Sequence, residues 1–179
     1  MASTNLKMLL QQKLTKETKL LSDECYTPKQ AIKPLVKYLE KNKIYYDCTS
    51  GKSSNIVDFL NNNDFKCLSS GSRDFLKSND LFYKNEMPNF DVIITNPPYS
   101  KKDKFIEKCY NLKKPFALLL PVSSIQGKKR GELFNKFGIE LLVLNNRVDF
   151  TGKSSPHFGV AWFCYKILNE KLIFVDNEK

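Results

Sequence analysis

From residue 44 onward the chain alternates short apolar runs with stretches in which apolar residues recur at helical spacing. Short apolar runs bounded by turn-forming residues predict buried strands, and apolar residues three or four positions apart predict amphipathic helices. We expect strands over 44–47, 65–68, 91–95, 116–120, 141–144, 160–167 and 172–175. Strands and helices in alternation are typical of a largely parallel sheet with crossover helices.

Four helices are expected among these strands. In the first, Thr27 would cap the helix and Pro28 would occupy its first position, with apolar residues at helical spacing over 31–39. Pro34 lies inside this pattern and is expected to bend it. The other three helices are expected around 56–60, 105–110 and 133–137, the last of them ending at Gly138.

The C-terminal part of the chain changes character, because only a short polar turn separates the apolar runs 160–167 and 172–175. Two such runs predict an antiparallel hairpin. The expected fold is therefore α/β, with helices on both faces of a mostly parallel sheet that ends in this hairpin. The length suits one domain over 24–179, with residues 1–23 left as an unassigned arm or helix.

Composition narrows the class of protein. Hydrophobic residues make up 41% and aromatic residues 12%, which excludes a disordered chain. Lys and Arg number 29 against 19 Asp and Glu, a net charge of +10 that favours a polyanionic partner, nucleic acid first; a merely solubilising surface charge is the alternative.

The five cysteines are scattered and none forms a Cys-x-x-Cys pair, which indicates free thiols in a reducing compartment and no zinc site. The sequence has no apolar run long enough to cross a membrane. We therefore expect a cytoplasmic protein without a bound metal. The oligomeric state is not predicted.

The strongest candidate site follows the apolar strand 91–95 directly and consists of Asn96, Pro97, Pro98 and Tyr99. Open parallel sheets bind ligands beyond the carboxyl ends of their strands, and two prolines make a stiff loop. The Asn96 side-chain oxygen and the Pro97 carbonyl are two rigid acceptors for the hydrogens of an amino group, which frees the nitrogen lone pair for attack. Tyr99 would stack on a base. The alternative is a simple strand-ending turn.

Four motifs follow one another along the chain: residues 26–28, 47–53, 74–76 and 96–99. With these motifs in this order, the region from about residue 25 to 166 resembles the S-adenosylmethionine-dependent DNA adenine N6-methyltransferases, particularly the small phage-type enzymes. The resemblance implies a Rossmann-like class I methyltransferase fold, methyl transfer to the amino group of adenine, and catalysis by the four residues of the Asn-Pro-Pro-Tyr loop. It also implies S-adenosylmethionine as cofactor and DNA as partner.

The resemblance further implies a set of cofactor-binding residues, which are Tyr26, Thr27, Pro28, Asp47, Cys48, Gly51, Asp74, Phe75 and Asn96. The first three would line the methionine side of the cofactor. Asp47 and Gly51 would hold its amino acid moiety, and Asp74 and Phe75 its adenine. A plain helix start explains Thr27 and Pro28 equally well, and a solvated turn explains Asp74.

The chain departs from the family pattern in three places. Cys48 stands where the family has proline, Ser53 stands for the second glycine, and residues 68–71 offer no acid to hold the cofactor ribose. These departures motivate an alternative, a methyltransferase fold kept as a nonenzymatic module that binds nucleic acid or another partner.

The sequence is also compatible with other methyl acceptors, and it contains part of another motif. Methylation of RNA or of a protein glutamine also fits an Asn-Pro-Pro-Tyr loop, but the basic charge favours nucleic acid. Residues 51–53 match the last three residues of a phosphate-binding P-loop, which would suggest a nucleotide hydrolase. Tyr46 occupies the position of the leading glycine of that loop, so this function is less favoured.

Basic residues near the predicted cleft are candidates for contacts with nucleic-acid phosphates. They are Lys101, Lys102, Lys128, Lys129, Arg130 and Lys153. A solvated helix start or loop is the alternative for each cluster.

Overall fold

The computed structural model of the protein describes residues 27–51, 54–85, 89–150 and 158–177. The elements in chain order are α2 (Lys29–Val36), β1 (Ile44–Asp47), α3 (Asn55–Asn61), β2 (Lys66–Ser69), α4 (Asp80–Asn85), β3 (Val92–Thr95), the 3₁₀ turn η1 (Tyr99–Lys101), α5 (Lys102–Leu112), β4 (Phe116–Pro121), the 3₁₀ turn η2 (Val122–Ile125), α6 (Lys128–Phe137), β5 (Glu140–Leu144), β6 (Val160–Tyr165) and β7 (Leu172–Val175).

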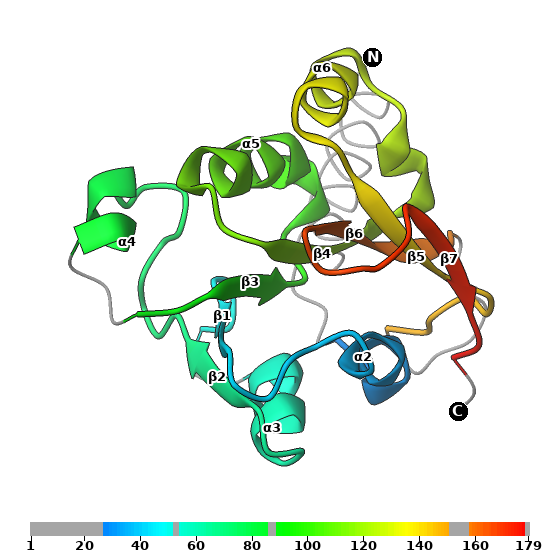
Figure 1. Ribbon diagram of the computed structural model, residues 1–179, viewed down its shortest axis with the longest axis horizontal. Helices are drawn as coiled ribbons and strands as arrows, with labels where there is room; N and C mark the ends of the chain where they lie inside the picture. The colour runs from blue at the N-terminus through cyan, green and yellow to red at the C-terminus, as the bar shows by residue number, and fades with distance from the viewer. Residues whose placement is uncertain (1–26, 52–53, 86–88, 151–157, 178–179) are drawn as a thin grey trace, which may run out of the picture.

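The strands of the described chain form one seven-stranded sheet in the order β2-β1-β3-β4-β6-β5-β7 (Figure 1). The pairs β1–β2, β1–β3, β3–β4 and β5–β7 are parallel, while β6 pairs antiparallel with both β4 and β5. Only β6 therefore runs against the others. The carboxyl ends of β1, β3 and β4 meet at one edge of the sheet, where ligands bind in folds of this kind.

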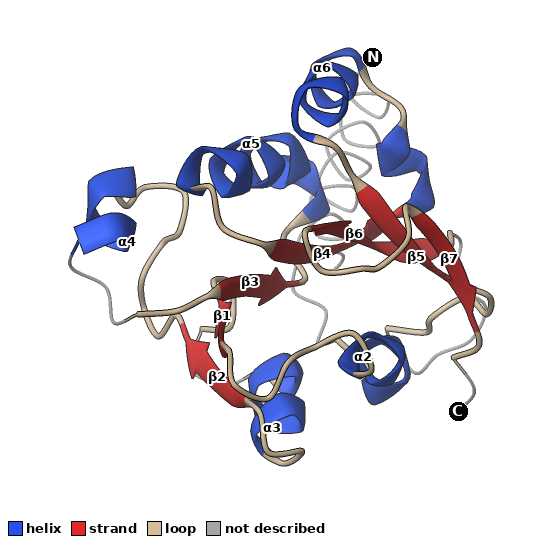
Figure 2. Cartoon of the chain, viewed as in Figure 1, coloured by secondary structure: helices blue, strands red, loops and turns tan. Residues whose placement is uncertain are grey.

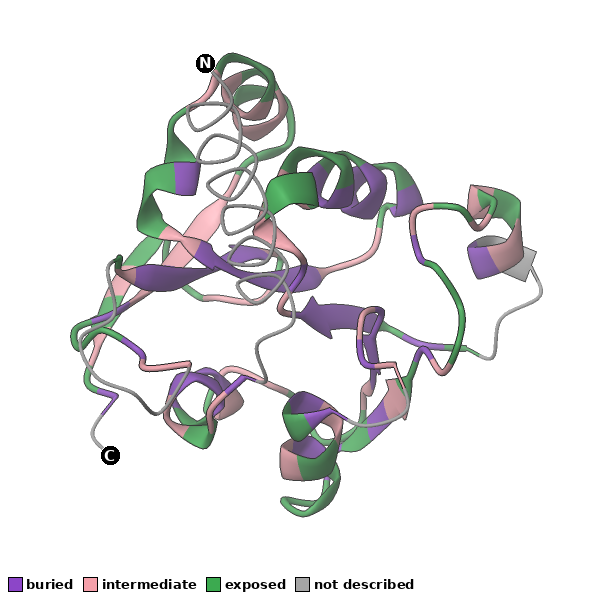
Figure 3. Cartoon of the chain, turned by 180° about the vertical axis from the view of Figure 1, so that it is seen from behind, coloured by how far each residue is buried: buried purple, intermediate pink, exposed green. Residues whose placement is uncertain are grey.

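Helices cover both faces of the sheet (Figures 1 and 2). On one face α2 and α3 pack against an apolar cluster that includes Trp162, and the Trp162 indole donates to the Ala31 carbonyl at 2.7 Å. On the other face α5 and α6 cover a second cluster that includes Phe163. The central strands β3, β4 and β6 are buried on both sides (Figure 3), and β3 is buried at all four of its positions. A strand buried on both faces reads as a continuous apolar run, which is why β3 was predictable.

All seven predicted strands are present, within about two residues of their expected ends. The expected α/β fold with a mostly parallel sheet is confirmed. Helices at 55–61, 102–112 and 128–137 also agree with the pattern, and α6 ends at Gly138, whose φ of 88° suits glycine.

The predicted C-terminal hairpin is wrong in its pairing, although β6 is antiparallel as expected. β5 lies between β6 and β7 and pairs with both. The Glu140 carboxylate, at the start of β5, accepts the backbone amides of Lys166, Ile167 and Leu168 at 2.8–3.0 Å. These bonds carry the chain after β6 across β5, so that β7 adds to the outer edge.

Two helix predictions also need correction. Helix α2 begins at Lys29 after an extended Pro28, and no side chain caps it, so Thr27 is not its cap. The helix ends at Val36, and the residues after it form tight turns, with Leu39 N bonding Val36 O at 3.0 Å. The short helix α4 carries no long apolar period and was not predicted.

No helix among the described residues is long and apolar enough to cross a membrane. Within the same ranges, no group of three His, Cys, Asp or Glu side chains is placed to hold a metal ion. Residues 1–23, Tyr26, Ser53 and Lys153 lie outside the described residues.

Candidate functional site

The loops after β1 and β3 are bonded to each other, as their predicted positions at one sheet edge require. Thr95 Oγ1 donates to Asp47 Oδ1 at 2.6 Å, and the hydroxyls of Thr49 and Thr95 lie 2.5 Å apart. Because the Thr95 hydrogen is directed to Asp47, Thr49 is the donor between the two hydroxyls. Thr49 Oγ1 also lies 3.3 Å from the Asn96 carbonyl, so the network reaches the candidate catalytic loop.

Asp47 is the centre of this network. Its Oδ1 also accepts the Thr49 amide at 3.2 Å, and its Oδ2 accepts the Ser54 hydroxyl at 2.5 Å. Burial raises the pKa of the Asp47 carboxyl, and the bonds from Ser54, Thr95 and Thr49 oppose that rise. The carboxylate is 2% exposed, so any contribution to ligand binding runs through the shape of the loop that it holds.

Gly51 lies on that loop in a left-handed conformation, with φ of 56°. A Cβ there would meet nothing within 4 Å, so the backbone angle and not crowding favours glycine. The Gly51 amide donates to Ser70 Oγ at 3.2 Å, and the Ser70 amide donates to Ser50 Oγ at 2.7 Å. The loops after β1 and β2 are thus also joined.

The side-chain oxygen of Asn96 is the exceptional atom at this edge. It is buried, and among the residues that the structure describes it has no hydrogen-bond partner. Buried polar atoms are nearly always satisfied, and leaving one unpaired costs about 1–3 kcal/mol. An unpaired acceptor at the end of β3 marks a position at which a ligand hydrogen would be bound.

The remainder of the Asn-Pro-Pro-Tyr loop is a compact turn. The Pro98 carbonyl accepts the Lys101 amide at 2.9 Å, which begins η1, and Pro97 is buried. The Tyr99 ring contacts the Phe158 ring edge-on, with centroids 5.8 Å apart. Phe158 comes from the segment before β6, so two aromatic side chains distant in the sequence meet beside Asn96.

Two residues expected at the cofactor lie instead in the apolar core. Cys48 is buried, and burial raises the pKa of its thiol far above the usual value. Phe75 is also buried, stacked on Phe105 at 5.4 Å and packed against Tyr83. In this structure neither side chain is presented to a ligand, because each fills space beneath α5.

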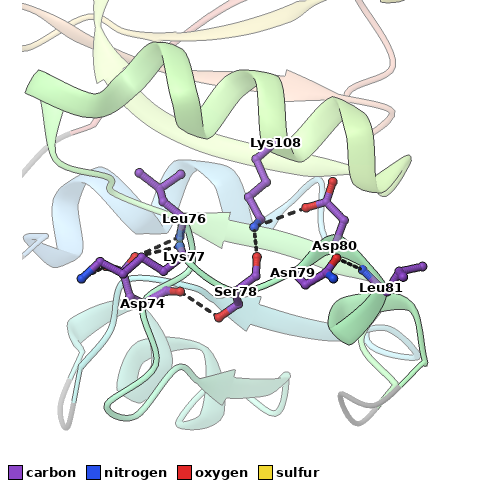
Figure 4. A network of polar contacts seen from close by, with 8 residues as sticks. All are labelled: Asp74, Leu76, Lys77, Ser78, Asn79, Asp80, Leu81 and Lys108. Carbon is purple, nitrogen blue, oxygen red and sulfur yellow. Dashed lines mark hydrogen bonds and ion pairs between the residues drawn. The ribbon is translucent and has the colours of Figure 1, made fainter.

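Asp74, next to Phe75, is exposed and organises a turn (Figure 4). Its Oδ1 accepts the amides of Leu76 and Lys77 at 3.0 and 3.3 Å. Desolvation works to raise the pKa of Asp74, but these amide bonds and the charges of Lys77 and Lys101 together outweigh it and leave the pKa below its usual value. Asp74 and Lys101 line a cavity of about 450 Å³ between this segment and α5.

The same segment is tied to α5 by Lys108 (Figure 4). Its ammonium group donates to the Ser78 carbonyl and pairs with Asp80 Oδ1 at 3.3 Å. It also lies 5.2 Å from the centroid of the Phe75 ring. A nearly buried lysine with these partners is a structural tie that holds Asp74 in place.

The predicted basic residues divide into two groups. Lys101, Lys128 and Lys129 are exposed, and Lys102 is half-buried with its ammonium 3.2 Å from the Tyr99 carbonyl. Arg130 is different and its predicted role is corrected.

The Arg130 guanidinium is occupied within the protein. Its Nε donates to the Ser124 carbonyl at 2.6 Å, its Nη2 donates to the Gln126 carbonyl and its Nη1 to the Asp103 carboxylate. The side chain is 12% exposed. Arg130 therefore braces the loop before α6 and is not a free phosphate ligand.

The residues that build this edge from within were not predicted from the sequence. They are small polar residues beside predicted strand ends: Thr49, Ser54, Ser70 and Thr95. Such residues occur at many turns, so the sequence alone does not mark these four. Phe158 had no local signal, because its partner Tyr99 is remote in the sequence.

Comparison with known proteins places the fold. No family model and no curated protein matches the chain. A solved structure from Listeria monocytogenes, provisionally assigned as a class I S-adenosylmethionine-dependent methyltransferase, superposes with a TM-score of 0.55 at 13% sequence identity, covering 84% of this chain. The chain spans 65% of the length of that protein. The protein thus has the fold of a class I methyltransferase.

Proposed function

We propose that this protein transfers a methyl group from S-adenosylmethionine to the exocyclic N6 amino group of adenine in DNA. The observation that carries the proposal is the buried Asn96 oxygen, which has no hydrogen-bond partner among the described residues. It lies at the carboxyl end of β3 in a methyltransferase fold, where a donor such as an amino group would satisfy it.

Some of the residues expected at the cofactor fit S-adenosylmethionine. Gly51, in its left-handed conformation, leaves the loop after β1 without a side chain at that point, and the exposed Asp74 remains ionised at neutral pH. Gly51 would bound the amino acid moiety, and Asp74 would accept from the adenine amino group. The half-buried Pro28 would line the methionine side, whereas Thr27 is only 5% exposed and offers little surface there. S-adenosylmethionine supplies a methyl group on a positively charged sulfur.

Each residue of the catalytic loop then has a separate task. The Asn96 oxygen and the Pro97 carbonyl accept the two hydrogens of the adenine amino group, which raises the electron density on its nitrogen. The Thr49 hydroxyl is bonded to Thr95 and lies 3.3 Å from the Asn96 carbonyl, so the loop is held close to this network and the acceptors need little rearrangement during the reaction. Tyr99 and Phe158 offer aromatic surface for the base.

DNA is preferred as the acceptor because of charge. The net charge is +10, and Lys101, Lys128 and Lys129 are exposed near the ends of β3 and β4. Contacts of lysine with phosphates would hold the strand around the target base.

A labelled-methyl assay with unmethylated DNA, RNA and unmodified protein as parallel acceptors tests the proposal. Incorporation into DNA adenine is expected. Asn96→Ala should lower kcat at least about 100-fold, since loss of one preorganised hydrogen-bonding group costs that much in comparable sites. Asn62→Ala, an exposed asparagine at the end of α3, is the matched control and should retain full activity. Incorporation into protein alone would exclude the proposed acceptor.

A nonenzymatic binding module is the second candidate function. Residues 69–71 after β2 carry no acid, and the Ser70 hydroxyl is already bonded to Gly51 and Ser50, so the ribose has no charged partner there. Calorimetry with S-adenosylmethionine separates the two functions. DNA binding without any cofactor heat at millimolar S-adenosylmethionine would favour the module.

A further inference from the structure

Exposed apolar side chains gather beside the candidate catalytic loop. Val122 and Ile125 of η2 are 40% and 44% exposed, and Phe158 is 41% exposed. The Val122 amide donates to the Gly159 carbonyl at 3.0 Å, which places Val122 next to Phe158, and Phe158 contacts the Tyr99 ring. The apolar surface is therefore continuous from the Asn-Pro-Pro-Tyr loop to η2.

The loop that carries Val122 and Ile125 is held rigidly. Arg130 donates to the carbonyls of Ser124 and Gln126 and pairs with Asp103 on α5. A Cβ at Gly127 would collide with the guanidinium, so the backbone packs directly on it. Rigid apolar side chains lose little entropy when they enter a binding partner.

The charges around this surface indicate what it contacts. Lys128 and Lys129 begin α6 three residues after Ile125, and Lys101 lies two residues after Tyr99, so exposed lysines lie on both sides of the apolar side chains in the chain. Apolar side chains within a basic border complement the base stack of a nucleic acid, which lies between two rows of phosphates.

We propose that Val122 and Ile125 form a wedge that enters the base stack of duplex DNA and fills the space left by the target adenine. The inference rests on the proposed function. An adenine inside a duplex cannot reach Asn96 until it rotates out of the stack, and an apolar side chain in the vacated space replaces part of the lost stacking. A single strand has no stack to restore, so the wedge matters for duplex DNA alone.

The test is methyl transfer to unmethylated duplex DNA and to the same DNA after heat denaturation. A variant carrying Val122→Ser and Ile125→Ser should be about tenfold slower than wild type on the duplex and within about twofold on single strands, because only the duplex must be unstacked. Ile125→Met keeps an apolar side chain and should retain the duplex rate. Leu172→Ser, 50% exposed at the opposite end of the sheet, is the control and should change neither rate.

Four results would overturn the wedge. An equal loss of methylation rate on duplex and single-stranded DNA, or no loss on either, would assign the side chains another role. If the double variant is much less stable than wild type, the single variant Ile125→Ser repeats the measurement. A wild-type dimer in light scattering that the double variant converts to a monomer would identify a self-association surface. If wild type methylates neither form of DNA, the proposed function fails, and the wedge with it.

Discussion

At the scale of single residues, one carboxylate organises the candidate site. Asp47 accepts hydrogen bonds from the Thr95 hydroxyl, the Thr49 amide and the Ser54 hydroxyl. The Thr49 hydroxyl, bonded to Thr95, lies 3.3 Å from the Asn96 carbonyl, so this network reaches the Asn96 backbone. A buried carboxylate that is satisfied in this way specifies one arrangement of its neighbours, because any other arrangement leaves charge unpaired. The precision of the Asn96 position therefore depends on Asp47.

The burial of Asp47 gives a prediction for pH. Its native pKa is raised above the value of about 3.9 in an unfolded chain, so the native state binds the proton more tightly. The free energy of unfolding of wild type, relative to Asp47→Asn, should therefore rise as the pH is lowered from 7 toward 4 and decline as the pH rises through the native pKa. Urea unfolding at several pH values measures this difference. Asp58→Asn, an exposed carboxylate on α3, serves as control, and parallel pH curves for wild type and Asp47→Asn would contradict the assignment.

At the scale of elements, charged side chains determine where two connections run. Arg130 on α6 fixes the loop after β4, and Glu140 on β5 fixes the loop after β6. In both cases the partners include backbone groups of the connecting loop, and Arg130 also pairs with the Asp103 carboxylate. A single charged side chain can meet several such groups at once, which is why each connection has one course.

The bracing role of Arg130 separates it from its neighbours. Arg130→Ala should cost about 2 kcal/mol in the free energy of unfolding, because it leaves carbonyls and Asp103 without their charged donor. Lys128→Ala and Lys129→Ala should leave stability unchanged and each reduce the salt dependence of DNA binding by about one unit of slope. Urea unfolding and salt titration of binding check both halves. A reduced slope for Arg130→Ala at unchanged stability would restore its predicted phosphate contact.

Glu140 gives a second prediction at this scale. Glu140→Ala should destabilise the protein by about 1–3 kcal/mol, since three backbone amides lose their acceptor. Glu140→Gln keeps one acceptor oxygen and should cost less. Glu132→Ala, an exposed acid on α6, is the control for loss of charge. Equal stability of Glu140→Ala and wild type in urea would show that strand pairing alone places β7.

At the scale of the whole molecule, one sheet unites the two apolar clusters. All seven strands, from the edge strand β2 to the edge strand β7, are hydrogen-bonded to their neighbours in the sheet. The Trp162 indole on β6 also donates to the Ala31 carbonyl of α2. The face covered by α2 and α3 therefore depends on the same strands as the face covered by α5 and α6. Unfolding is expected to be a single cooperative transition.

Trp162 is the chain's one tryptophan and reports on this transition. Its fluorescence and the helical circular dichroism should change together in urea. S-adenosylmethionine at 100 times its dissociation constant should raise the free energy of unfolding by about 2.7 kcal/mol, because it binds only the folded state. Two separate transitions would contradict the cooperative core, and an unchanged midpoint at millimolar cofactor would count against the proposed enzyme.

The sequence by itself determined the positions of the strands and the place of Asn96 at the end of one of them. These follow from local apolar patterns, since a strand buried on both faces must be apolar throughout. The closeness of the loops after β1 and β3 followed as well, because parallel strands end at one edge. The Asn-Pro-Pro-Tyr loop was accordingly predicted where the structure has it.

Only the tertiary structure decided which strand lies beside β6, what Arg130 binds and whether Phe75 is free to meet a ligand. Each depends on a partner distant in the sequence: Glu140 for the β6 connection, Asp103 for Arg130, and Phe105 for Phe75. Local patterns report how polar a position is, but the partner of a charge or an aromatic ring is set by packing. For the same reason, only the structure revealed that the Asn96 oxygen is buried without a partner among the described residues.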